Sequence, residues 1–151
     1  LRYTHGMSKS KIYNIWIGMR SRCNSNKNVE YKNYGGRGIR ISDEWNSFEQ
    51  FYLDMGDVPQ GMTLDRIDNN LGYSKENCRW ATSLEQSRNM RTNRFIEYKG
   101  ISMILPDWAW FLGIAEWTLR KNLSSSKWTI EKAIEESLIA SGRLHEAIVI
   151  E

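Results

Sequence analysis

Four polar residues in the middle of the chain have the types and spacing of a small catalytic site: Asp65, Arg66, Asn77 and Gln86. Asp65 offers a hard anionic oxygen and Gln86 a neutral carbonyl oxygen, which together suit one divalent ion, Mg²⁺ or Mn²⁺. Arg66 could bind a phosphate through two hydrogen bonds and stabilise charge that builds up in a transition state. The amide of Asn77 could tie down a loop. Taken singly, each residue has a purely structural explanation, and only their joint spacing favours chemistry on a phosphodiester.

The elements that must position these residues form a strand, loop, strand and helix. The two strands are expected over residues 62–66 and 77–81. A helix should begin at Thr82 and run to about residue 91, because Thr82 and Glu85 have the spacing of a capping box. In such a ββα unit the end of the first strand and the helix can face each other across a small cleft.

Three segments of this unit resemble the ββα-metal core of the HNH nucleases, in particular a branch found in phages and mobile elements. They are Leu64-Asp65-Arg66-Ile67-Asp68-Asn69-Asn70, Tyr73-Ser74-x-x-Asn77-Cys78-Arg79-Trp80-Ala81-Thr82 and Gln86-x-x-Asn89. The resemblance implies a metal-dependent DNA endonuclease, homing or restriction-like, that hydrolyses phosphodiester bonds of double-stranded DNA. By it Asp65 and Gln86 would hold one Mg²⁺ or Mn²⁺ ion, and the protein would act in the cytoplasm of a bacterial host.

The sequence departs from the family's pattern at the general base. The family's His directly after the first Asp is Arg66 here, and Gln86 replaces a His or Asn on the helix. Arginine cannot deprotonate water, because its side chain stays charged to above about pH 12. A minor branch with Asp-Arg carries a Tyr near the scissile phosphate, which makes Tyr34 a candidate to activate the nucleophile. His5 is the other candidate. The alternative is a catalytically inactive, sequence-specific DNA-binding protein on the same scaffold.

Glycines and charge around Tyr34 are consistent with a phosphate partner. Gly35 and Gly36 would let the backbone approach a phosphate closely. Residues 1–42 hold nine Lys and Arg against one acid, whereas residues 43–70 hold seven acids against one Arg, although the whole chain has a net charge of only +3. A basic arm beside an acidic block suits a metal-dependent enzyme on a polyanion, and two solvated faces are the alternative. The expected backbone contacts are Arg37, Arg40, Arg88, Arg91 and Arg94.

The N-terminal part should be an α+β domain that supports the ββα unit. We expect a helix over residues 8–23, a turn over 34–38, a strand over 39–41 and a helix over 44–55. The last helix would bury an aromatic face made by Trp45, Phe48, Phe51 and Tyr52. With this part, the nuclease-like core would comprise residues 1–92.

Residues 93–151 are expected to form a small helical module behind a basic linker. A hairpin over 95–105 precedes helices over 106–112, 115–123 and 128–138, and an apolar tail over 144–150. Ala109, Gly113, Ile114 and Leu119 have the spacing of a helix-turn-helix. The second helix would present Trp117, Arg120 and Lys121 to DNA; a helical hairpin packed on the core is the alternative.

Several classes of protein are disfavoured. No apolar run reaches the roughly 18–20 residues of a membrane span, and no signal peptide is visible. Two cysteines and two histidines are too few for a four-thiolate site and too scattered along the chain for a zinc knuckle, so no zinc is expected. The oligomeric state stays open between a monomer and a homodimer, since a palindromic target would need a dimer.

Overall fold

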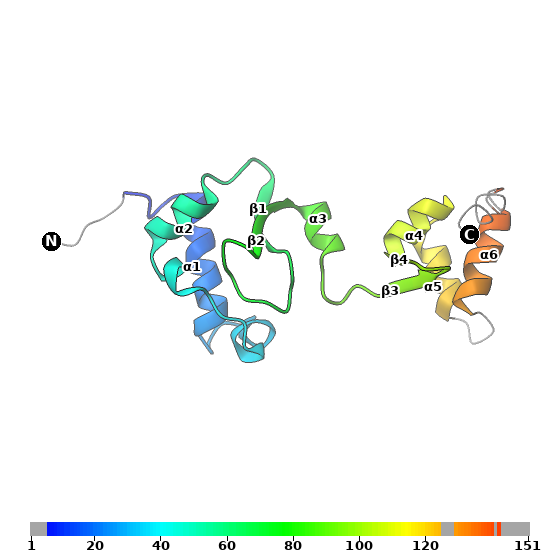
Figure 1. Ribbon diagram of the computed structural model, residues 1–151, viewed down its shortest axis with the longest axis horizontal. Coiled ribbons are helices and arrows are strands. Elements are labelled where there is room, and N and C mark those ends of the chain that lie inside the picture. The colour runs from blue at the N-terminus through cyan, green and yellow to red at the C-terminus, as the bar shows by residue number, and fades with distance from the viewer. Residues whose placement is uncertain (1–5, 125–128, 141, 143–151) are drawn as a thin grey trace. The chain divides into compact units, whose positions relative to one another are not determined.

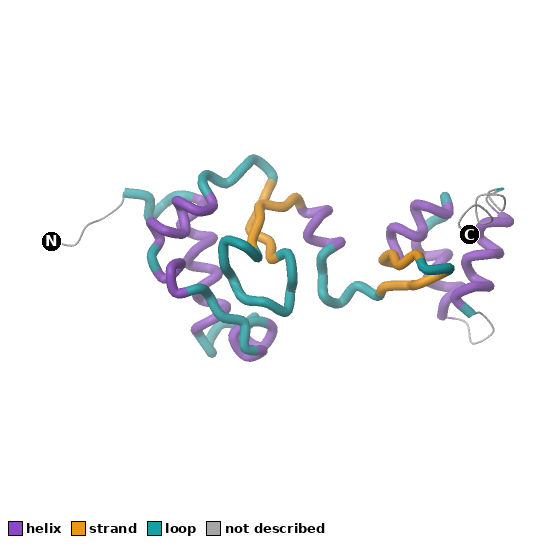
Figure 2. Tube along the Cα trace, in the orientation of Figure 1, coloured by secondary structure: helices purple, strands orange, loops and turns teal. Residues whose placement is uncertain are grey.

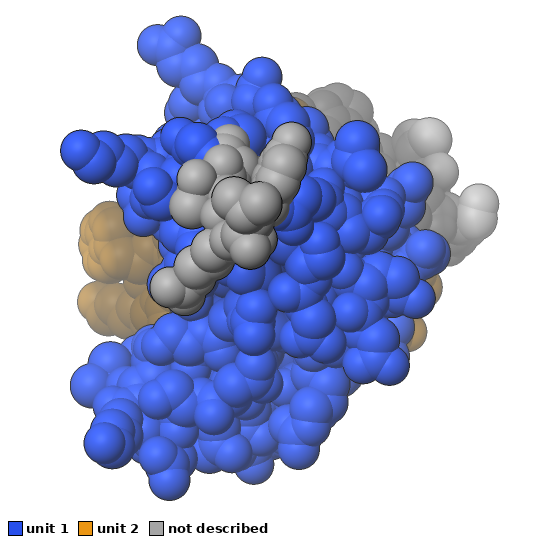
Figure 3. Space-filling model, turned by 90° about the vertical axis from the view of Figure 1, so that its left-hand side faces the viewer, with its two compact units in different colours: residues 1–91 blue, residues 92–151 orange. Residues whose placement is uncertain are grey.

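The structure is a computed structural model that describes residues 6–124, 129–140 and 142. The chain divides into two compact units, residues 1–91 and 92–151, which Figure 3 colours separately. Both units combine helices with one two-stranded antiparallel sheet, so the expected α+β class is confirmed. His5 and the tail over 144–150 lie outside the described residues. In the described part of the chain, no helix is long and apolar enough to cross a membrane.

Unit 1 begins with helices and ends with the strands and short helix that carry the site (Figure 1). Its regular elements are α1 (Lys11–Asn24), α2 (Phe48–Met55), β1 (Met62–Arg66), β2 (Cys78–Thr82) and α3 (Ser83–Arg88). Three 3₁₀ turns lie between them: η1 (Tyr31–Asn33), η2 (Gly35–Arg37) and η3 (Asp43–Asn46). Strands β1 and β2 pair so that Asp65 stands directly opposite Arg79.

The core of unit 1 lies between α1 and the aromatic residues around α2. Helix α1 begins after Ser10, whose side chain accepts from the backbone of Tyr13, and it buries Ile12, Trp16, Met19 and Cys23. The expected aromatic face is confirmed, because Trp45, Phe48 and Phe51 are buried and Tyr52 packs against them. The indole of Trp16 donates to the carbonyl of Trp45 at 2.8 Å, which joins the two sides of the core.

Three expected elements of unit 1 differ from the structure. The strand over 39–41 is wrong: only Ile41 forms a bridge, to Tyr73. The helix over 44–55 is interrupted at Ser47, because the Ser47 side chain accepts from the backbone of Gln50 and starts α2 anew. The capping box at Thr82 is confirmed, but α3 ends at Arg88, several residues early.

Unit 2 begins with a hairpin and continues with three helices, as Figure 2 shows. Strands β3 (Phe95–Tyr98) and β4 (Ile101–Ile104) turn through Lys99 and Gly100, which both have positive φ. The helices are α4 (Leu105–Leu112), α5 (Glu116–Ser124) and α6 (Ile130–Ala140). The expected hairpin and helices are therefore present, with boundaries shifted by a residue or two.

The turn between α4 and α5 is built from the small residues that the sequence pattern singled out. Ala109 is buried, Gly113 is in the left-handed region at φ 67°, and the backbone of Ile114 donates to the carbonyl of Ala109 at 3.0 Å. Leu119 and Leu112 are fully buried. The two helices thus pack on one apolar core.

Candidate active site

A pocket of about 390 Å³ brings together the residues expected to hold a metal ion and the tyrosine expected to act beside it. Asp65 comes from β1, Gln86 from α3, and Tyr34 from the turn before η2. The other lining residues are Asn69, Ser83, Ser87, Asn89 and Met90. The residues are distant in sequence, so their meeting depends on the antiparallel pairing of β1 and β2 and on the helix that follows directly.

One oxygen of Asp65 is engaged and the other is open. Its Oδ2 accepts from Nε of Arg79 at 3.3 Å and from Nδ2 of Asn89 at 3.0 Å. Its Oδ1 receives no hydrogen bond from any residue that the structure describes. The Asp65 side chain is 11% exposed, against 43% for Arg79. The carboxylate is therefore held in place by one oxygen while the other can accept a ligand.

Gln86 is oriented in a similar way. Its Nε2 donates to the backbone carbonyl of Leu64 at 3.1 Å, which fixes the amide against β1. Its Oε1 accepts no hydrogen bond within the described part of the chain, so this oxygen is the group that Gln86 can offer to a cation. The pocket therefore provides one carboxylate oxygen and one amide oxygen.

These donors fit Mg²⁺ better than zinc. Among the described residues, no three His, Cys, Asp or Glu side chains gather as a cage. Mg²⁺ usually keeps several waters and takes one or two protein oxygens together with substrate phosphate oxygens. Two protein ligands therefore match the number that Mg²⁺ sites usually have. Cys23 and Cys78 are buried and free. Burial raises the pKa of the Cys78 thiol to about 12, which keeps it protonated and unsuited to bind metal.

Asn89 directly follows the last residue of α3 and connects the end of this helix to β1 through hydrogen bonds. Its Nδ2 donates to Oδ2 of Asp65 and to the carbonyl of Arg66, while its own carbonyl accepts from the side chain of Asn69. These contacts explain why the helix stops at Arg88, because the next residue turns toward β1 instead of continuing the helix.

Arg66 lies behind the pocket and does not line it. It is 6% exposed, and its Nη1 donates to the carbonyl of Leu71 at 2.8 Å. Its guanidinium carbon is 5.1 Å from the ring centroids of both Tyr34 and Tyr73. The direct phosphate contact expected of Arg66 is thus absent from this arrangement, and Arg66 instead supports Tyr34, which does line the pocket.

A second arginine, which is half-buried, reaches the same tyrosines. The guanidinium carbon of Arg22 is 5.1 Å from the ring centroid of Tyr34, and its Nη2 donates to the hydroxyl of Tyr73 at 3.4 Å. Burial alone would lower the pKa of Arg22, but its interactions with Tyr73 and Tyr34 leave that pKa raised. Within the described residues, no carboxylate pairs with Arg22 or Arg66. Two uncompensated positive charges therefore adjoin the ring of Tyr34.

Asn77 holds the loop between the two strands, as expected, and its side chain lies away from the pocket. It is 7% exposed, its Oδ1 accepts from the backbone of Asp68 at 2.9 Å, and its Nδ2 donates to the carbonyls of Asp68 and Gly72. Its place among the catalytic candidates is therefore corrected to a positioning role.

The turn after Tyr34 uses its glycines differently from the expectation. Gly35 is buried, and a Cβ built there would lie 2.0 Å from the carbonyl oxygen of Cys23 and 2.4 Å from the ring of Tyr31. The close approach at Gly35 is thus to helix α1, not to a phosphate. Its consequence is to lock Tyr34 against the core.

The expected backbone-contacting arginines of unit 1 lie at exposed positions. Arg37 and Arg91 both donate to Asn33, the first to its carbonyl at 3.3 Å and the second to its Oδ1 at 3.3 Å. Arg40 donates to the carbonyls of Gly35 and Ile39. Arg88 is on the last turn of α3. Since Asn33 precedes Tyr34, the pair Arg37 and Arg91 puts positive charge close to the pocket.

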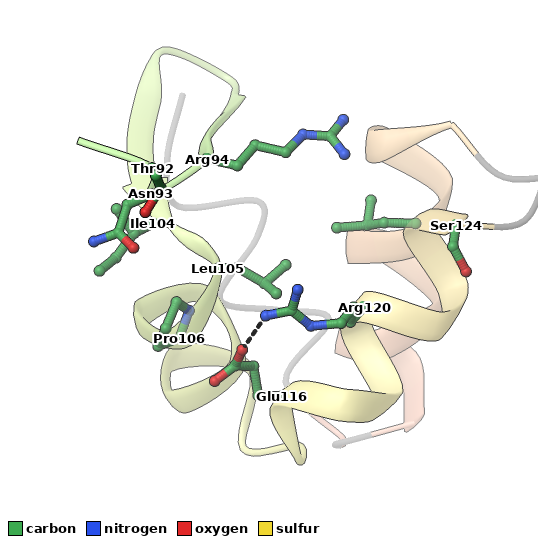
Figure 4. Close-up of a pocket in the computed structure, with 10 residues that line it drawn as sticks. Thr92, Asn93, Arg94, Ile104, Leu105, Pro106, Glu116, Arg120 and Ser124 are labelled. Atoms are coloured by element: carbon green, nitrogen blue, oxygen red, sulfur yellow. Dashed lines mark hydrogen bonds and ion pairs between the residues drawn. The ribbon is translucent and has the colours of Figure 1, made fainter. Parts of the chain in front are cut away.

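Of the expected DNA contacts of unit 2, two line a pocket and two do not. Arg94 and Arg120 line a separate pocket of about 280 Å³ between the hairpin and α5, and Figure 4 shows the Arg120 side chain turned toward Glu116. Arg120 Nη2 donates to Oε1 of Glu116 at 2.6 Å. Trp117, which is 68% exposed, and Lys121 lie outside that pocket. Arg120 is therefore already paired with an acid, whereas the contacts of these residues with DNA stay a prediction.

Comparison with known proteins gave no relative: no protein-family model, no curated protein and no solved structure matches this chain.

Four residues of the site were not predicted as members of it: Arg22, Tyr73, Arg79 and Asn89. Arg79 and Asn89 stand in the segments that resemble the HNH core, but the position of Arg79 opposite Asp65 depends on a strand register that the sequence analysis did not predict. Asn89 follows Gln86 by three residues, which is the spacing of side chains on one helix face. Tyr73 also stands in one of these segments, but Arg22 is 51 residues away from it and no local pattern links the two.

Proposed function

We propose that the chain is a metal-dependent endonuclease of the HNH type that hydrolyses phosphodiester bonds in double-stranded DNA. The observation that carries this proposal is the shared pocket of Asp65, Gln86 and Tyr34, with an open oxygen on the carboxylate and uncompensated arginines behind the tyrosine. A site with one anionic oxygen ligand and a surplus of positive charge is suited to a metal ion and a phosphate together.

In this proposal each residue has a distinct part. Asp65 and Gln86 hold one Mg²⁺ or Mn²⁺ ion, which supplies Lewis-acid stabilisation of the phosphate when it is bound. Arg79 and Asn89 orient Asp65. Arg66, which is buried, and Arg22, which is half-buried, supply positive charge partly shielded from water, where it counts for more than in bulk solvent.

The group that handles the proton of the nucleophile is either Tyr34 or His5. Tyr34 is favoured because it lines the pocket and its hydroxyl has no hydrogen-bond partner among the described residues. A positioned acid–base group typically contributes 10²–10⁴-fold to a rate, so the two candidates are separable by mutation. Full activity in Tyr34→Phe, with loss in His5→Ala, would assign the role to His5.

A nicking assay tests the proposal. Purified protein is incubated with supercoiled plasmid in Mg²⁺, Mn²⁺ or EDTA, and binding to the same DNA is followed by gel shift. We expect open-circular or linear product with Mg²⁺ or Mn²⁺ and none with EDTA. Absence of cleavage with either metal, together with a clear gel shift, would overturn the nuclease proposal.

That outcome would favour the second candidate, a catalytically inactive, sequence-specific DNA-binding protein. Its support is specific: Arg66 occupies the position of the family's general base, and its guanidinium is buried and bonded to Leu71. In either case unit 2 would contribute to DNA binding through the exposed Trp117 and Lys121 of α5, which is the second helix after the Gly113 turn.

A further inference from the structure

A second pocket in unit 1 is strongly basic and is not part of the site described above. It has a volume of about 530 Å³ and lies between one side of α1 and the strand β1. Its cationic lining residues are Lys9, Lys11 and Arg22, and the others are Asn14, Ile15, Gly18, Thr63 and Leu64. No carboxylate lines it, so three positive charges share one cavity without a compensating acid.

The cations at the start of α1 interact unfavourably with the dipole of that helix. The N-terminus of α1 already carries the positive end of the helix dipole, where acidic side chains are stabilising and lysines are not. The first turn of α1 nevertheless contains no acid and begins with Lys11. Lys11 Nζ donates to the carbonyl of Met62 at 3.1 Å, which holds that cation at the β1 side of the pocket.

Arg22 connects this pocket with the candidate active site. Its Nε is buried and has no hydrogen-bond partner. Its Nη1 lies over Gly18, where a Cβ would be 3.6 Å away, and its guanidinium carbon is 5.1 Å from the ring of Tyr34. One half-buried cation therefore lines the basic pocket and contacts a residue of the other pocket, so the two cavities are neighbours within one compact unit.

We propose that the basic pocket binds a backbone phosphate of DNA beside the phosphodiester held at Asp65. This inference rests on the proposed function, since it names a second contact for the same substrate. Lys9 and Lys11 neutralise the phosphate at the surface, and Arg22 provides the charge at the base of the pocket. The shared chemistry is that of a phosphate oxygen, so a free phosphate ion is the other ligand to test.

The test compares two double variants of equal charge. Lys9→Gln/Lys11→Gln removes the two surface cations of the pocket, and Lys27→Gln/Lys32→Gln removes two exposed lysines outside it. Affinity for a fluorescein-labelled duplex is measured by anisotropy across a salt series, in EDTA so that no cleavage occurs. Thermal melts establish that both variants fold.

We expect the pocket variant to lose about tenfold or more in affinity and to reduce the slope of log K against log salt by about one. The control variant should change affinity by less than about twofold. Equal losses in the two variants, or no loss in the pocket variant, would overturn the inference, and retained plasmid nicking by the wild-type chain would then leave the proposed function standing.

A second experiment tests the pocket in case the wild-type chain does not bind DNA. That failure to bind DNA would overturn the proposed function. Inorganic phosphate is titrated into the isotopically labelled protein, and the backbone amide signals of Gly18 and Leu64 are followed. Saturable shifts that vanish in Lys9→Gln/Lys11→Gln would support a phosphate pocket independent of DNA. Unchanged signals would overturn the pocket as a phosphate site.

Discussion

The two units bury very different kinds of side chain. Unit 1 buries Arg66 and Asn77 and leaves Nε of Arg22 without a partner. Unit 2 has an apolar core whose buried polar side chain, Ser137, donates to the carbonyl of Ala133 one turn earlier at 2.7 Å. Unpaired buried charge is costly to a fold, whereas a hydroxyl bonded within its own helix costs little.

This difference indicates where each unit acts. In unit 1 a buried cation, Arg66, lies against Tyr34, which lines the pocket, so we expect the proposed phosphodiester hydrolysis to take place in unit 1. In unit 2 the charges lie outside the core and Arg120 is paired with Glu116. Unit 2 is therefore expected to contribute through its surface, with smaller effects per residue.

The largest expected effect is on the hydroxyl of Tyr34. Because that hydroxyl has no hydrogen-bond partner among the described residues, Tyr34→Phe should change the melting temperature very little. If Tyr34 activates the nucleophile, the nicking rate should fall by about 10²–10⁴-fold. Tyr31→Phe, a nearby tyrosine outside the pocket, is the control. A rate within twofold of wild type in Tyr34→Phe would remove Tyr34 from the mechanism.

The next effect concerns the residue that orients Asp65. Asn89→Ala removes one donor to Oδ2 of Asp65 and should lower metal affinity or activity by about 10–100-fold. The activity is measured against Mg²⁺ concentration, and Asn26→Ala in an exposed loop serves as the control. An unchanged Mg²⁺ dependence in Asn89→Ala would show that Asp65 does not depend on it.

A pH effect is expected from the buried tyrosine of unit 1. Burial raises the pKa of Tyr73 to about 12, against the opposing effect of Arg22. The folded state thus favours the neutral phenol, so this stabilisation is complete below about pH 10 and is lost as the pH rises toward about 12.

The stabilisation that corresponds to a pKa shift of this order is about 3 kcal/mol. Thermal melts of the wild-type chain should therefore show falling stability between pH 10 and 12, with a shallower fall in Tyr73→Phe. Cys78 has a raised pKa as well, so part of the alkaline loss should remain in that variant. Identical pH profiles would contradict the assignment to Tyr73.

The smallest effects belong to unit 2. Lys121→Gln should weaken DNA binding a few-fold and reduce the salt slope by about one. Arg120→Gln should have less effect, because Glu116 already compensates that charge. Anisotropy titrations at several salt concentrations compare the two variants. A larger loss of DNA affinity in Arg120→Gln than in Lys121→Gln would contradict the smaller effect expected for the paired Arg120.

Local signals predicted the elements that carry the site, and long-range packing explains what they missed. The expected strand over 62–66 and the Thr82 capping box placed β1 and α3, and thereby Asp65 and Gln86 in one pocket. The end of α3 was missed because Asn89 turns toward Asp65 and Arg66, partners more than 20 residues away. The burial of Arg66 was missed for a similar reason, since its neighbours Tyr34 and Tyr73 come from separate loops.

The most direct test of the central claim is the nicking rate of Asp65→Asn, which keeps the size of the side chain but removes its charge. Wild type, Asp65→Asn and Asp43→Asn, an exposed control, are compared on supercoiled plasmid at saturating Mg²⁺. We expect Asp43→Asn to match wild type and Asp65→Asn to be slower by about 100-fold or more, since a metal ion contributes several kcal/mol. Cleavage by Asp65→Asn at the wild-type rate would contradict a metal-dependent site at Asp65.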